Sequence, residues 1–240
     1  MSKPFSKLAL LSPLATFVGI GIAAYAVLAY RSGEMHFVTA IDTFTWGAYV
    51  AIAALLLSLT ALWLTRPGAY RRGLLAALTS LVFAIPLVYA AFMFEYTARI
   101  YPPINDISTD LEDPPSFWEI ENPRTYPGGE VAEMQTQAYP DLAPLQLGLE
   151  STQVFRLAEQ LAVDFGWEII AADESDMQIE AVAYSFLFGF SDNVVIRIMD
   201  EGDTSRVDMR SYSQLGRIDR GANAKRIQRY LQALQDLVTE

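Results

Sequence analysis

The stretch that decides the fold runs from Arg206 to Leu237 and opens as Arg-Val-Asp-Met-Arg-Ser-Tyr-Ser-Gln-Leu-Gly-Arg-Ile-Asp-Arg-Gly-Ala-Asn-Ala-Lys-Arg-Ile. Alternating apolar residues predict a strand that ends near Ser213. Two glycines, Gly216 and Gly221, then mark a turn. Apolar residues at helical spacing follow it. The stretch therefore predicts a strand, a turn and a final helix, which together close an α+β domain.

Upstream of this stretch, the sequence predicts a helix and three further strands. The helix spans residues 151–165, and Ser151 is suited to cap its first turn. The further strands are predicted at residues 167–171, 177–186 and 194–199, ahead of the strand at 204–213, with turns at 173–176, 191–193 and 200–203. Short connections favour antiparallel pairing. We therefore expect a helix, a four-stranded mainly antiparallel sheet and a second helix, with both helices on one face.

The N-terminal part is far more apolar than this domain. The whole chain is 52% hydrophobic, with a mean hydropathy of +0.22, which suggests a membrane part joined to a soluble domain. Uncharged runs of spanning length occupy about 8–30, 44–64 and 74–94. A cleaved signal peptide is the alternative for the first run, with Ala24-Tyr-Ala26 as its processing site. The length of that run favours a retained span, so the sequence predicts three transmembrane helices.

The distribution of positive charge predicts the orientation of these helices. Lys3 and Lys7 precede the first run, and Arg66, Arg71 and Arg72 lie between the second and third. Positive residues in short loops favour the cytoplasmic side. The sequence therefore predicts a bacterial inner-membrane protein with a cytoplasmic N-terminus and a periplasmic C-terminal domain. Because no span contains a charged residue or a histidine, a transport role is disfavoured.

Three regions follow from this pattern: an anchor over 1–95, a connecting segment over 96–141 and the α+β domain over 142–240. The connecting segment is rich in proline and acid, which predicts extended chain and turns. Its carboxylates Asp106, Asp110 and Asp113 are weak candidates for calcium, but their spacing does not match a calcium-binding loop. We therefore expect no metal and a solvated acidic segment that docks along the domain. Gly128-Gly129 predicts a loop.

Charge and composition exclude several function classes. Residues 96–240 hold 25 acidic and 11 basic residues, and so large an excess of acid disfavours nucleic-acid binding. The chain has no cysteine, which excludes disulfides, thiolate metal sites and cysteine catalysis. We expect no cofactor.

The candidate site lies where positive charge gathers in the domain. Residues 206–229 hold seven Lys or Arg against two Asp, which allows two interpretations. In one, this basic unit packs against the acidic connecting segment. In the other, Arg210, Ser211, Ser213 and the start of the last helix bind an anion. Strand alternation places Arg206, Asp208 and Arg210 on the open face of the sheet, with Val207 and Met209 on the core side. There, Arg210 pairs with Asp208 or Asp192, or receives an anion.

The same residues resemble the C-terminal signature of domain-of-unknown-function family 1499, which reads Arg-Ser-x-Ser-x-x-Gly-x-x-Asp-x-Gly-x-Asn-x-x-Arg-Ile. The matching residues are Arg210, Ser211, Ser213, Gly216, Asp219, Gly221, Asn223 and Arg226. The segment from Ile104 to Pro115 resembles the opening of the family's membrane-attached members. Many members begin with Asn-Cys-Val, which this cysteine-free chain lacks. The resemblance implies fold and boundaries but no activity.

The function expected from these residues is binding rather than catalysis. The glycines serve turn geometry, and Asp219 caps the last helix or pairs with an arginine. We expect an envelope protein or an anionic lipid head group as the partner, beside the lipid bilayer itself. The alternative is a hydrolase or transferase that uses Ser211 or Ser213 with Arg210 and Asp219. The domain has no histidine to activate either serine, and only Lys225 is available as an amine base.

Overall fold

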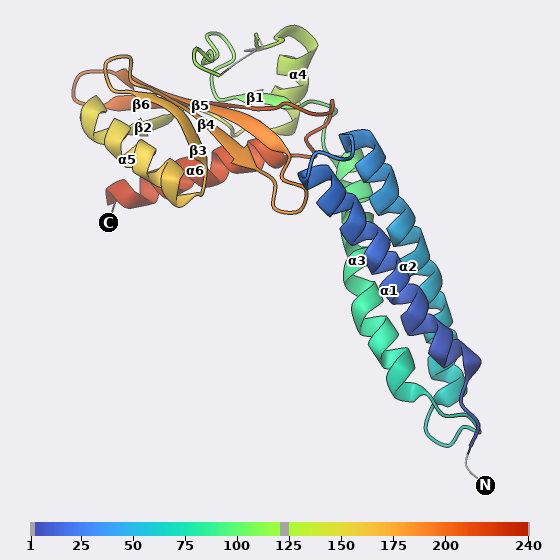
Figure 1. The fold of residues 1–240 in the computed structure, drawn as a ribbon. Helices are drawn as coiled ribbons and strands as arrows, with labels where there is room; N and C mark the ends of the chain where they lie inside the picture. Colours follow the sequence, from blue (N-terminus) through green and yellow to red (C-terminus); the bar gives the residue numbers. More distant parts are fainter. Residues whose placement is uncertain (1–2, 121–124, 240) are drawn as a thin grey trace. The chain divides into compact units, whose positions relative to one another are not determined.

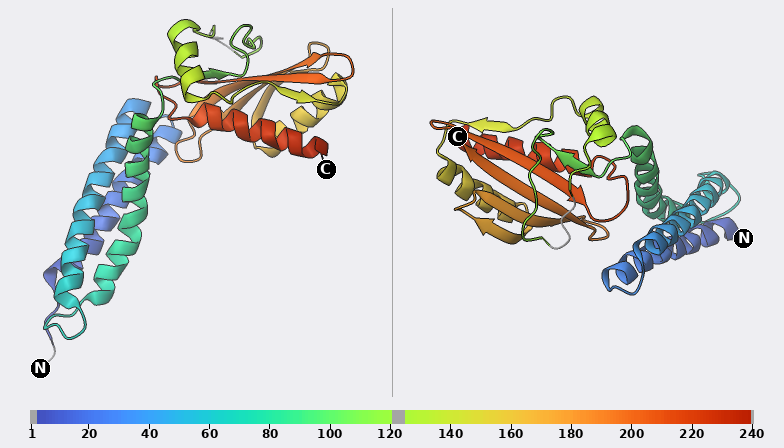
Figure 2. Two further views of the ribbon diagram at one scale, coloured as in Figure 1. Left: turned by 180° about the vertical axis from the view of Figure 1, so that it is seen from behind. Right: turned by 90° about the horizontal axis from the view of Figure 1, so that it is seen from above.

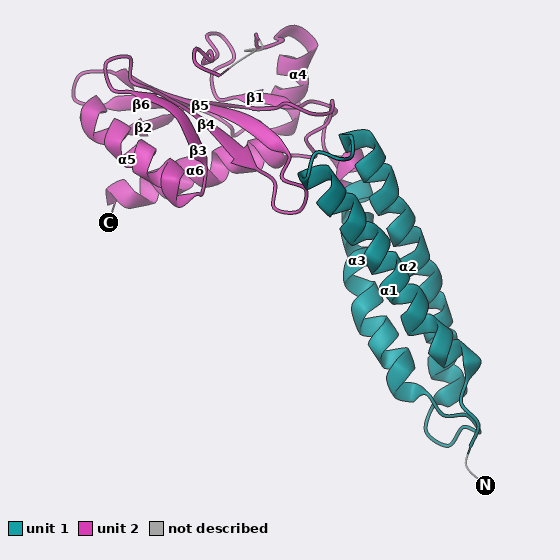
Figure 3. Cartoon of the chain, viewed as in Figure 1, with its two compact units in different colours: residues 1–96 teal, residues 97–240 magenta. Residues whose placement is uncertain are grey.

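The computed structural model describes residues 3–120 and 125–239 and divides into two compact units, Met1–Tyr96 and Thr97–Glu240 (Figure 3). We call them unit 1 and unit 2 and describe each by itself. Unit 1 consists of long apolar helices, and unit 2 contains a sheet with helices.

The described part of unit 1 contains three helices, α1 (Lys7–Arg31), α2 (Phe37–Thr65) and α3 (Leu74–Ile100), the last of which continues past Tyr96 into unit 2 (Figure 1). Each is long and apolar enough to cross a membrane. This confirms the three predicted apolar helices. The helices are longer than the predicted uncharged runs, because polar residues continue the helical turns at their ends. The chain is thus consistent with a membrane protein.

Small residues bring these helices close together. Gly19 of α1 faces Gly47 of α2, and a Cβ built on Gly47 would lie 2.7 Å from the Gly19 carbonyl oxygen. Between α1 and α3, the hydroxyls of Thr16 and Ser80 are 2.8 Å apart. Ser58 of α2 donates to the Ala77 carbonyl oxygen at 2.6 Å. Small and hydroxyl side chains therefore allow close backbone approach, as is typical of helix packing in membranes.

Unit 2 is an α+β fold, as the sequence predicts. Its elements are β1 (Asp106–Ser108), α4 (Gly129–Ala138), β2 (Leu145–Leu147), α5 (Ser151–Asp164), β3 (Glu168–Asp173), β4 (Gln178–Tyr184), β5 (Ser191–Asp200), β6 (Ser205–Ser213) and α6 (Ala222–Thr239). Among the described residues, six strands form one antiparallel sheet in the order β1-β6-β5-β4-β3, with β2 also paired to β6. The prediction of four strands was therefore wrong. Strands β1 and β2 have three residues each, too few to show an alternating pattern.

The sheet is covered on both faces. Helices α5 and α6 lie on one face, the chain after β1 lies over the other, and helix α4 lies beside the sheet at its β1 edge (Figures 1 and 2). The main core lies under the two helices, where Val154, Ile196, Met209 and Ile227 are fully buried. A smaller cluster on the opposite face joins Phe117 and Ile120 to Val182 and Val195. Strands β4 and β5 therefore bury apolar side chains on both faces of the sheet.

Local details differ from the sequence expectations at three places. Gly128 and Gly129, expected in a loop, begin helix α4, while residues 121–124 lie outside the described chain. Residues 191–193, expected as a turn, belong to β5, and the hairpin turn lies at 185–190. The N-cap of α5 is Glu150, so Ser151 is the first helical residue rather than the cap.

Candidate functional site

Strand β6 carries the candidate residues on two opposite faces of the sheet. Val207 and Met209 are fully buried in the helix-side core, as alternation predicts. Ser211 lies on this same side, whereas Arg210 lies on the other. The sheet therefore separates the arginine from the two serines, and the predicted anion site combining Arg210, Ser211 and Ser213 does not assemble on one face.

Arg210 is held by groups from the segment that precedes α4. Its Nε and Nη2 donate to the two carboxylate oxygens of Asp106, each at 2.9 Å, and its Nη1 donates to the Pro115 carbonyl oxygen at 3.2 Å. The guanidinium also lies over the Phe117 ring at 5.2 Å and the Tyr126 ring at 5.6 Å. Only 1% of Arg210 is exposed. The expectation of an open face was wrong, because the connecting segment covers it, and the pairing partner is Asp106 rather than Asp208 or Asp192.

The register of β1 explains this pairing. Ser108 lies opposite Arg210 in the antiparallel pair β1–β6, so Asp106 is the diagonal neighbour on the same face. Both side chains of the pair are 1% exposed. A bidentate arginine–carboxylate pair in such a place fixes β1 against β6 by charge-assisted hydrogen bonds. Sequence reasoning missed Asp106 as the partner, because a three-residue strand within a proline-rich segment has no recognisable sequence pattern.

A second group of charges lies beside this pair on the same face. Arg206 contacts Asp110 at 2.6 Å and Asp208 at 3.0 Å, and Arg197 contacts Asp208 at 3.1 Å and Asp113 at 2.8 Å. Burial acts to raise the pKa of Asp110, but backbone N–H donors from Asp113 and Glu112 and the two arginines outweigh it and lower that pKa. The weak calcium candidates Asp106, Asp110 and Asp113 are thus each paired with arginine. Within residues 3–120 and 125–239, no three His, Cys, Asp or Glu side chains gather as metal ligands.

Two further polar side chains fix the covering segment to the domain. Gln135 of α4 donates to the Ser108 carbonyl oxygen at 2.6 Å and accepts from the Ser108 N–H at 3.0 Å, so its amide extends the ladder beyond β1. The Glu180 carboxylate, on a residue that is 1% exposed, accepts the N–H groups of Trp118, Glu119 and Ile120. Sequence reasoning missed both, because a polar residue inside a strand or helix pattern is expected to face solvent.

On the helix side, the signature residues form one connected network. Ser211 Oγ donates to Asn223 Oδ1 at 2.7 Å, and Arg226 Nη1 donates to Ser211 Oγ at 2.8 Å. Arg226 also pairs with Asp192 at the start of β5. Asn223 Nδ2 donates to Ser213 Oγ at 2.9 Å and to the Asn105 carbonyl oxygen at 3.1 Å. These bonds join α6, β5, β6 and the chain before β1.

The turn before α6 is fixed by the remaining signature residues. Asp219 accepts the N–H groups of Gly221 and Asn223 at 2.8 and 2.9 Å, which confirms the expected helix cap. Burial raises the pKa of Asp219 despite these hydrogen bonds. Gly216 has φ +80° and its carbonyl oxygen accepts from Asn105 Nδ2 at 2.7 Å. Gly221 has φ +77°, and an added Cβ would lie 2.7 Å from the Tyr101 ring.

The chemistry of this network is that of a packed junction. Ser211 is fully buried, and its hydroxyl is engaged by Asn223 and Arg226. Lys225, the amine considered as a base, lies over the Tyr101 ring at 4.6 Å. The single histidine of the chain, His36, belongs to the N-cap of α2 in unit 1. Both serines are hydrogen-bonded to Asn223, and Ser211 also to Arg226, so the arrangement joins elements instead of exposing a nucleophile.

Comparison with known proteins agrees with the signature. A family described as "Protein of unknown function (DUF1499)" matches residues 106–234, which is more than half of the chain. The match begins at Asp106, the partner of Arg210, and contains all of the signature residues discussed above. No curated protein matches the sequence. The residues that carry the signature are those that join β1, β6 and α6, and on this match the chain belongs to the DUF1499 family.

Proposed function

We propose that the protein is a multi-pass protein of a bacterial inner membrane that displays unit 2 in the periplasm, where unit 2 binds a partner protein. One observation favours a binding function over a catalytic one: the signature side chains are buried and hydrogen-bonded within the domain. Arg210 is 1% exposed and paired, and Ser211 is fully buried and hydrogen-bonded. A hydrolase or transferase would need one of these groups to reach substrate.

The orientation rests on the distribution of cations in unit 1. Lys3 and Lys7 lie at or before the start of α1, and Arg66, Arg71 and Arg72 lie between α2 and α3, whereas the region where α1 ends and α2 begins has Arg31 against Glu34 and Asp42. Such a bias favours a cytoplasmic location for the N-terminus and the α2–α3 connection. With three spans, the C-terminal unit is then outside the cytoplasm.

A reporter fused after Glu240 tests this orientation. We expect an alkaline phosphatase fusion to be active, because that enzyme requires the periplasm, and a cytoplasmic reporter at the same point to be inactive. The reciprocal pair fused within residues 66–72 should show the opposite pattern. Active cytoplasmic reporters at both points would reject the proposed topology.

The surface proposed for partner binding is the β4–β5 hairpin tip, residues 184–190. Tyr184 is 54% exposed, Phe186 97% and Leu187 44%. The turn is internally fixed: Gly189 N–H donates to the Ser185 carbonyl oxygen at 2.9 Å, and Phe190 N–H donates to Ser185 Oγ at 2.8 Å. A preformed turn that exposes large apolar side chains is a feature of interaction sites, where aromatic residues are enriched.

Charge favours a protein over a lipid surface as the occupant of this tip. Residues 180–196 contain no Lys or Arg, and residues 96–240 hold 25 acidic against 11 basic residues. Anionic bilayer surfaces attract basic segments and repel acidic ones. A protein with an apolar cleft and a basic rim is complementary both to the aromatic tip and to the acidic unit that carries it.

A photo-crosslinking amino acid at position 186 of the full chain tests this surface in native membranes, with position 170 on the edge strand β3 as the matched control. Ile170 is also exposed, at 42%. We expect a discrete protein adduct at 186 only. Binding of that protein, once purified, should be lost in F186S/L187S and kept in I170S. Lipid adducts alone, or equal binding by both variants, would exclude the hairpin tip as a protein-binding surface.

A further inference from the structure

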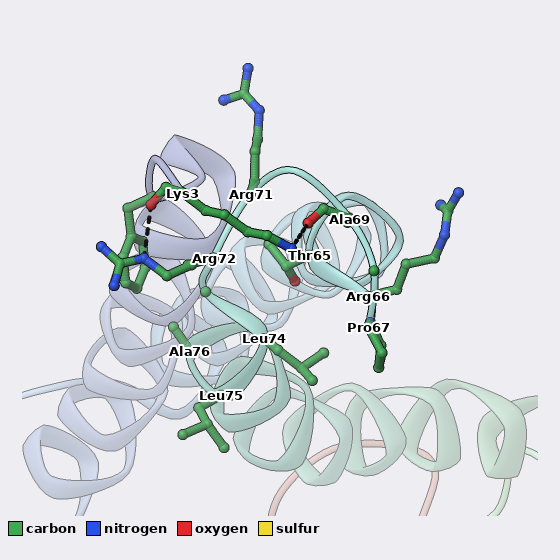
Figure 4. A pocket seen from close by; sticks show the side chains of 13 residues that line it. Lys3, Thr65, Arg66, Pro67, Ala69, Arg71, Arg72, Leu74, Leu75 and Ala76 are labelled. Atoms are coloured by element: carbon green, nitrogen blue, oxygen red, sulfur yellow. Dashed lines mark hydrogen bonds between the residues drawn. The ribbon is translucent and has the colours of Figure 1, made fainter. Parts of the chain in front are cut away.

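The end of unit 1 where the chain begins contains a cavity that none of the functions above uses. The segment before α1 and the α2–α3 connection line an open cavity with a volume of about 370 Å³ (Figure 4). Its floor is apolar, with Phe5, Pro67, Leu74 and Leu75 among the lining residues. Its remaining lining includes four cationic residues, Lys3, Arg66, Arg71 and Arg72.

Hydrogen bonds between the two chain segments build this cavity. Arg72 N–H donates to the Pro4 carbonyl oxygen and Ser6 N–H donates to the Arg72 carbonyl oxygen, both at 2.9 Å. Arg72 Nε donates to the Lys3 carbonyl oxygen at 2.8 Å, and Lys3 Nζ donates to the Ala69 carbonyl oxygen (Figure 4). The segment before α1 is therefore joined to the α2–α3 connection on both sides of the cavity.

Two arginines on the rim are not part of these bonds. In Figure 4, the side chains of Arg66 and Arg71 extend outward from the α2–α3 connection in different directions. Arg66 donates to the Trp63 carbonyl oxygen at 2.9 Å, and its guanidinium lies 4.8 Å from the centre of the Trp63 ring. No acidic residue occurs in 1–33 or 43–94, and Glu34 and Asp42 lie near the start of α2, at the opposite end of that helix, so the segments that form this rim contain no carboxylate. The cavity thus combines an apolar floor with uncompensated positive charge.

The position of the cavity along the helices indicates which part of a membrane would surround it. It lies where α2 ends at Thr65 and α3 begins at Leu74. Trp63 and Tyr70, which are 65% and 76% exposed, lie near the same helix ends, as aromatic residues do at membrane interfaces. In a protein whose three helices cross a membrane, this level is that of the lipid phosphates, and basic pockets between helices bind anionic head groups there.

We propose that this cavity binds the head group of an anionic phospholipid. Arg66 and Arg71 hold its phosphate, and the floor formed by Phe5, Leu74 and Leu75 contacts the start of its acyl chains. Arg and phosphate form charge-assisted and bidentate hydrogen bonds. Lys3 and Arg72 act as positioning residues, since their hydrogen bonds hold the two segments together.

Native mass spectrometry of the purified full chain, with phosphatidylglycerol or phosphatidylcholine added in detergent, tests the proposal. R66Q/R71Q removes the two rim cations and leaves the bonds of Lys3 and Arg72 intact. R31Q/R99Q is the matched control, because it removes two arginines at the far ends of α1 and α3. We expect the wild-type chain and the control to retain phosphatidylglycerol over phosphatidylcholine. R66Q/R71Q should bind phosphatidylglycerol about thirtyfold more weakly, and R66K/R71K, which keeps the charge, should restore most of the binding.

The competing outcomes are equally distinct. Equal retention of phosphatidylglycerol by R66Q/R71Q and R31Q/R99Q would overturn the proposed site. Release of the bound lipid by millimolar inorganic phosphate would also overturn it, because it would show that the cavity recognises a soluble anion. A loss of binding in R66K/R71K equal to that in R66Q/R71Q would assign the effect to altered structure and so contradict a charge-based site.

Discussion

At the scale of single residues, Arg210 depends on Asp106. The two side chains are 1% exposed and share two hydrogen bonds of 2.9 Å. Removing one member of a buried ion pair leaves the other charge without compensation. We therefore expect R210M to lower the free energy of unfolding by about 3–5 kcal/mol, as measured by urea denaturation of a fragment spanning residues 97–240.

Two further variants separate this effect from a general cost of removing arginine. Arg156 pairs with Glu174 at the surface, where its side chain is 73% exposed, so R156M should change stability by no more than about 0.5 kcal/mol. The double variant D106L/R210M replaces both charges with apolar groups and should regain part of the loss. If R210M is as stable as R156M, the buried pair does not hold the sheet.

Asp110 gives unit 2 a specific sensitivity to acid. Its pKa is lowered from the ordinary value of 3.8, since N–H donors and two arginines outweigh the effect of burial. A carboxylate with a lowered folded-state pKa contributes stability that is present above the unfolded pKa and lost as pH falls through the folded pKa. We expect D110N to be less stable than the wild type at pH 7 and to approach it as pH falls below about 4. Thermal melts from pH 7 to pH 3 measure this, and parallel curves would contradict the role of Asp110.

At the scale of elements, the turn before α6 depends on a glycine for two separate reasons. Gly221 has φ +77°, and a Cβ there would meet the Tyr101 ring at 2.7 Å. Gly202, in the β5–β6 hairpin, has φ +85° with nothing within 4 Å, which makes G202A the matched control. We expect backbone strain to lower the free energy of unfolding by about 1–2 kcal/mol in both variants. Overpacking against the ring should lower it by about 1–3 kcal/mol more in G221A.

The double variant Y101A/G221A isolates that second cost. Removing the ring provides space for the new Cβ, so G221A should destabilise a Y101A background only by the backbone term that G202A shows. Urea denaturation of the four proteins gives the comparison. An equal cost of G221A with and without Tyr101 would mean that the ring moves freely and that only φ matters.

The elements that the sequence predicts well are those with a regular pattern. Helices α5 and α6 and strands β3 to β6 are long enough for helical or alternating periodicity, and the membrane helices show it as uninterrupted hydropathy. Alternation also predicts which side of β6 carries Val207 and Met209. By contrast, β1 and β2 have three residues each, and their pairing with β6 is decided by contacts far away in the sequence.

Sequence reasoning selected several residues of the candidate site, but it did not predict how they are arranged. The signature contains Arg210, Ser211, Asn223 and Arg226, and sequence reasoning selected all four. One of the two sequence interpretations, in which the basic unit packs against the acidic connecting segment, is confirmed, but it did not identify Asp106, 104 residues earlier, as the partner of Arg210. Gln135 and Glu180 were missed because their hydrogen-bond partners are backbone groups of a proline-rich segment without periodicity.

At the scale of the whole molecule, the boundary of unit 2 decides which fragment folds. The chain before α4 provides β1, the carboxylate for Arg210 and the N–H groups for Glu180. Tyr101 packs against Gly221 and Lys225. A fragment that begins at residue 142, where the sequence alone places the domain, lacks all of these groups and leaves one face of the sheet uncovered.

We therefore expect two fragments with the same helices α5 and α6 to behave differently. Residues 97–240 should be soluble without unit 1 and unfold in one cooperative thermal transition, since that fragment contains both layers over the sheet. Residues 142–240 should aggregate or unfold without cooperativity, because Val182 and Val195 become exposed and Arg210 loses the carboxylate of Asp106. Circular dichroism melts and size-exclusion chromatography measure both properties. A cooperative and monomeric 142–240 fragment would show that the segment before α4 is an attachment to the domain, and aggregation of 97–240 would show that unit 2 needs the membrane helices to fold.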